Sequence, residues 1–255
     1  MKPILRGITD TAIYIILFFM LQLLSTLVFN GICNDGTLAM VAGLGTSAVL
    51  TIIIFHFARF SPLGLGYIKT RPYALLAWLI VLSLGLLAPS QYLEEMIPAD
   101  MPDQTAKALG MVITHPLGFL VIDILAPVAE EMVFRGAILR TLLACMRSQW
   151  MAIVVSAVLF GLVHGNVPQF LHAFLIGLLL GWVFWRTGSI LPGLVVHWVN
   201  NSVAFLLCRL CPENIDATLP ELFGGNNLLM YAVIIVSALI TALSLWRLVH
   251  CLGRK

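Results

Sequence analysis

The feature that most constrains the fold is a series of apolar runs, most of them long enough to cross a lipid bilayer. The hydrocarbon core is about 30 Å thick, so a spanning helix needs about 20 apolar residues. Within that core each main-chain polar group needs a partner in its own segment, and a helix provides one. The runs lie at about Ile8–Ile32, Leu38–Phe57, Pro72–Pro89, Leu117–Cys145, Met151–His164, Gln169–Trp185, Leu191–Leu207 and Leu228–Val249. They predict an all-α membrane protein, a bundle of about eight transmembrane helices.

The composition agrees with this class. Hydrophobic residues make up 60% of the chain and charged residues only 10%, whereas soluble domains carry about 25% charged residues. The net charge of +2 is small and scattered, which argues against a nucleic-acid partner and leaves membrane lipids as the expected surroundings. We expect a single polytopic membrane domain over residues 1–255. Nothing in the sequence indicates an oligomeric state.

The basic residues predict the orientation in the membrane, because cytoplasmic loops are enriched in Lys and Arg. With a cytoplasmic N-terminus, the outer side receives only Lys107 and Arg209. The cytoplasmic side then receives eleven basic residues, namely Lys2, Arg6, Arg59, Lys69, Arg71, Arg140, Arg147, Arg186, Arg247, Arg254 and Lys255. Both termini are therefore expected in the cytoplasm. A compact chain without long cytosolic insertions is typical of a bacterial inner-membrane protein.

Four polar side chains within three of the predicted spans share a similar depth: Glu130, His164, His197 and Asn201. At a rise of about 1.5 Å per residue, they lie about 12–20 Å from the cytoplasmic ends of their helices. Scattered packing residues have no reason to agree in depth. A buried acid, two imidazoles and an amide together can activate water and stabilise an oxyanion. We therefore predict that these four residues form a catalytic site.

The spacing of the polar residues separates two adjacent acids. Glu131 and Arg135 are four residues apart on one helix face, with the acid first, which favours an ion pair. Glu130 is displaced by about 100° and is free to take part in chemistry. Other polar residues in or near the spans have no companion at helical spacing and are expected to be packing residues: His56, His115, Asp123 and His172.

The ordered set of motifs resembles the CAAX protease and bacteriocin-processing (Abi) family of intramembrane endopeptidases. The first motif is Glu130-Glu131-x-x-x-Arg135, the second is Phe160-x-x-x-His164 and the third is His197-x-x-x-Asn201. The segment GSILPGLVVH also resembles the family's run into its third motif. The resemblance covers about Leu117 to Leu207, roughly a third of the chain.

The resemblance implies an eight-helix fold with a cavity open to the cytoplasm, in which a peptide bond is hydrolysed. Glu130 would be the general base that activates water, assisted by His164. His197 and Asn201 would stabilise the tetrahedral oxyanion, and Glu131 with Arg135 would hold the site. The substrate would be a hydrophobic or lipidated peptide, such as a prenylated CAAX-type segment or a bacteriocin leader.

Whether a metal takes part stays open at the level of the sequence. Glu130, His164 and His197 provide the donors of a His₂Glu zinc site, which keeps its fourth position for water. The same groups can activate water without a metal ion.

Two other classes of function also fit the pattern. Acids and histidines within a helix bundle form proton relays in coupled transporters, but the common depth and the absence of internal repeats argue against that class. A catalytically idle scaffold or immunity protein is the third hypothesis, which an intact set of polar residues disfavours.

Overall fold

A computed structural model describes residues 2–64, 70, 73–97, 110–211 and 217–253. Within these ranges the chain is helical apart from turns and caps, and it contains no strand. The long helices are α1 (Lys2–Ile32), α2 (Gly36–Phe57), α4 (Ala74–Glu95), α8 (Gln149–Leu162), α9 (Val167–Thr187), α10 (Leu191–Leu210) and α12 (Asn227–Leu252). The predicted all-α class is confirmed.

The fourth apolar run forms one continuous helical rod with two changes of register. A π-helical segment, η1 (Leu120–Leu125), leads into α6 (Ala126–Glu131), and a second π-helical segment, η2 (Met132–Leu139), leads into α7 (Arg140–Cys145). Pro127 lies in the first turn of α6 and does not break the rod. Short π-helical insertions are frequent at functional sites, because the extra residue redirects the side chains that follow.

Six of the described helices are long and apolar enough to cross a membrane, namely α1, α2, α4, α9, α10 and α12. Helix α8 is apolar but shorter, and the rod from η1 to α7 accounts for the remaining predicted run. The described residues therefore contain a helical segment for each of the eight runs, and the protein is an integral membrane protein.

Several helices are longer than hydropathy predicts, and α4 shows a physical reason. Helix α4 continues past Pro89 to Glu95, where the apolar run has already ended. The Ser90 hydroxyl donates to Leu86 O at 2.7 Å, and the Glu95 carboxylate accepts from the main-chain N–H of Leu219, 2.9 Å away, at the start of α11 (Leu219–Leu222). The last turn is thus held by contacts with a distant segment, which a hydropathy pattern does not register.

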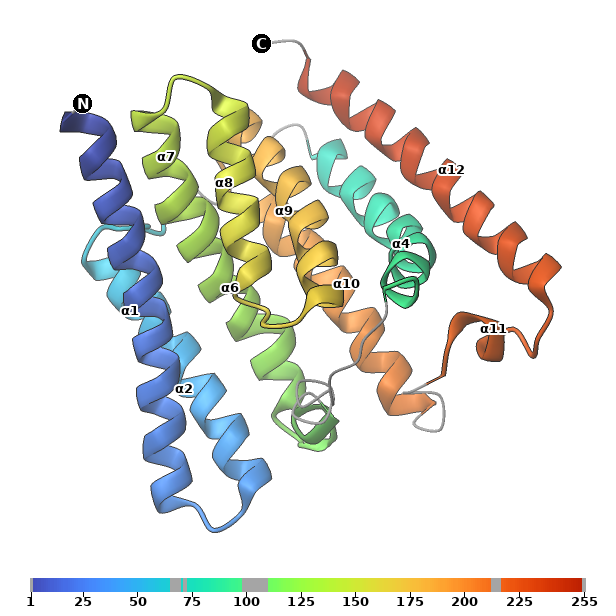
Figure 1. Cartoon of the computed structure of the whole chain (residues 1–255), viewed down its shortest axis with the longest axis horizontal. Helices are drawn as coiled ribbons and strands as arrows, with labels where there is room; N and C mark the ends of the chain where they lie inside the picture. The colour runs from blue at the N-terminus through green and yellow to red at the C-terminus, as the bar shows by residue number, and fades with distance from the viewer. Residues whose placement is uncertain (1, 65–69, 71–72, 98–109, 212–216, 254–255) are drawn as a thin grey trace.

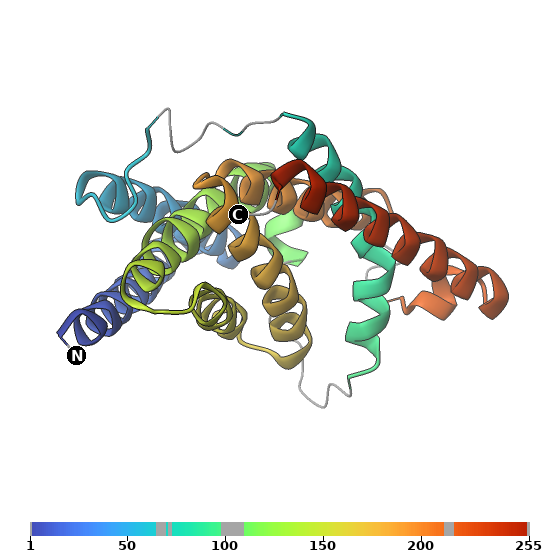
Figure 2. The same cartoon turned by 90° about the horizontal axis from the view of Figure 1, so that it is seen from above.

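The helices lie side by side in an elongated bundle (Figures 1 and 2). Helices α1 and α2 pack together at one edge, and α4 packs against α12 at the other. Helix α10 contacts α4, α6, α9 and η1, which places it in the middle of the bundle. Both termini lie at the upper end of the bundle in Figure 1, as an even number of crossings requires.

The core is centred on η2, where every residue from Met132 to Leu139 is buried. Phe18 of α1, Phe55 of α2 and Phe160 of α8 pack against this segment. At the edges, by contrast, α1 and α12 expose large apolar side chains such as Leu27 and Leu239, which suits contact with lipid. The polar residues of the first motif therefore lie in the best-packed part of the molecule.

Candidate active site

The two adjacent glutamates end α6 in different surroundings. The Glu131 side chain is 1% exposed, whereas that of Glu130 is 26% exposed. An ionised group can be kept in a dry interior only with a partner. Glu131 is therefore the acid that needs permanent partners, and Glu130 is the one with an accessible side chain.

The partner of Glu131 is Arg135, as the spacing predicts. Arg135 Nη1 donates to Glu131 Oε1 at 2.7 Å, and both side chains are almost completely buried. The guanidinium carbon also lies 4.3 Å from the centre of the Phe160 ring, an attraction worth about 2 kcal/mol when desolvated. The ion pair thus fastens α6 and η2 to α8.

His197 of α10 lies between the two carboxylates. Its Nδ1 is 3.7 Å from Glu130 Oε2, and its Nε2 is 3.5 Å from Glu131 Oε1. Both distances exceed those of a good hydrogen bond, but they bring the imidazole within the electrostatic reach of both acids. The structure therefore joins the first and third motifs at this ring.

The first turn of α10 is pressed against the Glu131 carboxylate. A methyl group at Gly193 would overlap Oε2 and Cδ of Glu131. Only glycine therefore permits this approach, which brings the positive end of α10 close to an acid. The prediction of site residues did not include Gly193, although it lies in the segment GSILPGLVVH that carries part of the resemblance.

His164 follows the end of α8 and is fixed by the main chain. Its Nδ1 lies 2.8 Å from the carbonyl oxygen of Phe160. A carbonyl only accepts, so Nδ1 carries the hydrogen in the neutral ring and Nε2 keeps a free lone pair. Such a nitrogen can accept a proton or a hydrogen bond from water.

Phe160 connects the motifs through its ring. The sequence predicts Phe160 only as the first residue of the second motif and gives it no role in the site. The ring centre lies 5.0 Å from that of His164 and 5.6 Å from that of His197. With Arg135 over one face, the ring contacts residues of all three motifs. An apolar side chain gives no sign of this role except its spacing of four residues from His164.

Asn201 contacts η1. Its Nδ2 donates to the main-chain oxygen of Ile122 at 3.0 Å. The next residue, Ser202, donates from its hydroxyl to Asp123 Oδ1 at 2.9 Å. Asn201 thus lies one turn from His197 on α10, and a main-chain acceptor determines its orientation.

The residues expected to be packing residues have hydrogen-bonding or ionic partners in the fold. His56 Nδ1 accepts from Leu63 N at 3.0 Å, and His115 Nδ1 accepts from Leu117 N at 3.2 Å. His172 Nδ1 lies 3.0 Å from Glu94 Oε1, which links α9 to α4. Asp123 does have a companion, Ser202, which local helical spacing could not reveal because it lies on another helix.

The donor set for a metal ion does not form. In the described part of the chain no group of three or more His, Cys, Asp or Glu side chains is arranged to hold a metal ion. The set of Glu130, His164 and His197 considered from the sequence therefore does not fit a zinc site in this arrangement.

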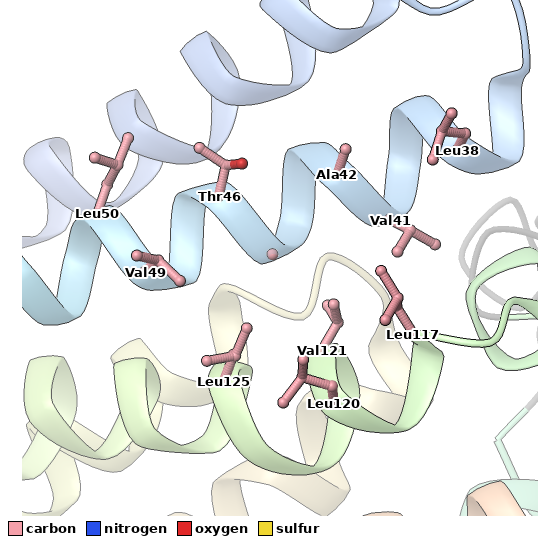
Figure 3. A pocket seen from close by; sticks show the side chains of 11 residues that line it. Leu38, Val41, Ala42, Thr46, Val49, Leu50, Leu117, Leu120, Val121 and Leu125 are labelled. Atoms are coloured by element: carbon pink, nitrogen blue, oxygen red, sulfur yellow. The ribbon is translucent and has the colours of Figure 1, made fainter.

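Two apolar hollows flank the helix that carries Glu130. One, of about 310 Å³, lies between α2 and the η1 region (Figure 3) and is lined by apolar side chains with one hydroxyl, that of Thr46. Leu117, Leu120 and Leu125 point into it from η1 and the residues before it (Figure 3). The other, also of about 310 Å³, lies between the η1–α6 segment and α10 and includes Asp123 and Trp198.

Comparison with known proteins supports the class of enzyme. A family model described as type II CAAX prenyl endopeptidase Rce1-like matches residues 113–203, a segment that contains all the motif residues. No curated protein and no solved structure matches the chain. The matching family is one of endopeptidases, so protease is the class of activity that the match supports. The match agrees with the resemblance to the CAAX protease family: over residues 113–203 this chain is similar to that family's Rce1-like endopeptidases.

Proposed function

We propose that this protein is an intramembrane endopeptidase that hydrolyses a peptide bond in a hydrophobic or lipidated substrate. The water that attacks is activated by Glu130 and His164. The observation that carries the proposal is the difference in exposure between the side chains of the two glutamates. Glu131 is sealed against Arg135, whereas Glu130 keeps a quarter of its side chain exposed beside His197.

In this mechanism Glu130 takes a proton from water while the water oxygen attacks the carbonyl carbon of the substrate. The free Nε2 of His164 accepts a hydrogen bond from the same water and orients it. The proton on Glu130 then passes to the nitrogen of the leaving amine as the carbon–nitrogen bond breaks. General base catalysis of this kind contributes about 10²–10⁴-fold in rate.

The tetrahedral intermediate carries a negative oxygen, which His197 and Asn201 are proposed to stabilise. His197 Nδ1 faces the Glu130 side, and the Asn201 amide has two N–H groups of which Ile122 uses one. Oxyanion donors of this type contribute about 10²–10³-fold each. Glu131 and Arg135 support the site by fixing the position of His197 and Phe160.

The apolar hollows beside the site support a substrate with an apolar or prenylated segment. The hollow between α2 and η1 is a groove that we propose to hold such a segment, beside the residues that lead into α6 (Figure 3). We place the enzyme in a bacterial cell membrane, where the substrate would reach this groove from the lipid.

The test uses purified protein in proteoliposomes with quenched fluorescent peptides, with and without a farnesylated cysteine. Glu130→Gln keeps the side-chain volume but cannot take the proton, so kcat should fall about 10²–10⁴-fold while the protein stays folded. Glu131→Gln should show the opposite balance, with poorer stability and a smaller loss of kcat.

The matched control is Glu94→Gln. The Glu94 side chain is 25% exposed and lies near a histidine, as Glu130 does, but it lies on α4 beside His172. Its kcat should stay near that of the parent. Normal cleavage by a folded Glu130→Gln variant would refute the mechanism.

A further inference from the structure

Two neighbouring side chains of α10 are hydrogen-bonded to two neighbouring residues of η1. The Asn201 amide donates to the Ile122 carbonyl at 3.0 Å, and the Ser202 hydroxyl donates to Asp123 Oδ1 at 2.9 Å. We call these four residues the α10–η1 clasp. Two attachment points on each element restrain both the rotation and the sliding of α10 against η1.

The register of η1 and the proline that follows it leave the Ile122 carbonyl without its regular helical donor. In a π-helix the N–H of residue i bonds to the carbonyl of residue i−5, and the N–H of Ala126 bonds in this way to Val121 O. The next donor in that register would be residue 127, which is proline and has no N–H. In an α-helical register the donor would be Ala126, whose N–H is already bonded to Val121.

In a membrane an unpaired carbonyl is costly, because no water reaches the hydrocarbon core to satisfy it. The Asn201 amide removes this cost. Once one of its two N–H groups is bonded to Ile122, the plane of the amide and the direction of the second N–H are set. Asn201 lies one helical turn from His197, so this orientation bears on the site.

We propose that Pro127 is a positioning residue for the reaction, because it leaves the Ile122 carbonyl free to orient Asn201. The inference rests on the proposed function, in which Asn201 stabilises the oxyanion. Ser202 and Asp123 complete the arrangement by fixing α10 at the height where Asn201 meets that carbonyl. The π-helical register of η1 is thereby linked to catalysis.

Pro127→Ala tests the proposal directly. The new N–H at position 127 bonds to Ile122 O, so this carbonyl no longer depends on Asn201, and the amide shares its acceptor and is held in its orientation less firmly. A misplacement of about 1 Å in an active site can lower the rate about 10²-fold, and we expect kcat to fall about 10–10²-fold with KM unchanged. Since the substitution adds a main-chain hydrogen bond, Tm should be unchanged or raised.

Asn201→Ala in both backgrounds separates positioning from simple structural damage. In the parent, Asn201→Ala strands the Ile122 carbonyl and should lower Tm, whereas in Pro127→Ala the carbonyl is already bonded and Tm should not fall. The losses of kcat in the double variant should be much less than multiplicative, as expected for residues that act through one contact.

Pro89→Ala is the matched control, since Pro89 also lies within a helix, in α4 away from the motifs, and its kcat should stay unchanged. The proposal is overturned by a normal kcat in Pro127→Ala, by multiplicative losses in the double variant, or by a fall of Tm that accompanies the loss of kcat. A parent that cleaves no peptide would refute the proposed function. The Tm coupling between positions 127 and 201 would still decide whether Pro127 frees the carbonyl for Asn201.

Discussion

Two neighbouring glutamates of identical chemistry are made different by what lies around them. Glu131 shares one oxygen between Arg135 and His197, and its other oxygen lies against Gly193. Breaking a buried pair of this kind typically costs about 3–5 kcal/mol, because the remaining charge is stranded. Glu130 has only His197 at ion-pair distance among the described residues. Burial thus separates an acid that is held by its partners from one whose side chain stays accessible.

Gly193→Ala should destabilise the protein severely. The added methyl group overlaps the Glu131 carboxylate, so α10 must move away or the ion pair with Arg135 must break. Overpacking alone costs about 1–3 kcal/mol, and disturbance of the buried pair adds to that. A thermal melt in detergent should show a large loss of Tm, or a low yield of folded protein.

Gly31→Ala is the matched control for this substitution. Gly31 lies in α1, and a methyl group added there meets nothing within 4 Å. Its Tm should stay the same or rise slightly, since alanine favours a helix over glycine by about 1 kcal/mol. Equal effects of the two substitutions would contradict the tight contact between Gly193 and Glu131.

At the scale of the element, α2 ends through a residue in an unfavourable conformation. Arg59 has φ of 60° and is the one non-glycine residue with positive φ in the described ranges. The chain turns back there, as the bond from Ser61 N–H to Phe55 O at 2.9 Å shows, in the manner of a helix end that usually carries glycine. Arg140 of α7 donates to the carbonyl of Phe60, the residue after Arg59. This hydrogen bond holds the turn against the rod formed by η1, α6, η2 and α7.

Arg59→Gly should therefore stabilise the protein. The left-handed conformation costs a non-glycine residue about 1–2 kcal/mol, and the exposed Arg59 side chain contributes little packing. A gain of about 1 kcal/mol corresponds to a rise in Tm of about 2–4 °C for a chain of this size. The main-chain oxygens that face Arg140 are unchanged by the substitution.

Gly188→Ala tests the same argument in the opposite direction. Gly188 follows α9 with φ of 68°, and a methyl group there meets nothing within 4 Å. Its Tm should fall, because only the backbone conformation opposes the change. If both variants melt like the parent, left-handed strain is not important at either helix end.

At the scale of the whole molecule, the bundle places both chain ends on one side (Figure 1). The basic residues divide eleven to two between the sides in the predicted orientation, which predicts that this side faces the cytoplasm. The Gly224–Gly225 turn precedes α12, and the C-terminus follows the other end of that helix (Figure 1).

A reporter fused after Lys255 should therefore be active only if it is one that works in the cytoplasm. A fluorescent protein should fluoresce there, and alkaline phosphatase should be inactive. The same two reporters inserted at Gly224–Gly225 should give the reverse result. Strong phosphatase activity after Lys255 would contradict the orientation.

The sequence by itself determined the class of fold and one of the contacts near the candidate site. A spanning helix satisfies its own main chain, so composition and run length suffice to predict it, and α2, from Gly36 to Phe57, differs from the prediction by two residues at its start. The pair of Glu131 and Arg135 was also predictable, because four residues on one helix face set the distance. Both properties depend only on residues that are close together in the sequence, so they can be predicted without the tertiary structure.

Only the tertiary structure decided which groups meet between helices. In lipid the surroundings are as apolar as the side chains, so hydrophobicity does not tell which face of a helix packs. The placing of His197 between two acids, the approach of Gly193 and the ring of Phe160 therefore needed the assembled bundle. The contact of Asn201 with Ile122 needed still more, because it depends on the π-helical register that leaves that carbonyl free. A register is a property of the packed helix and not of its residues taken one at a time.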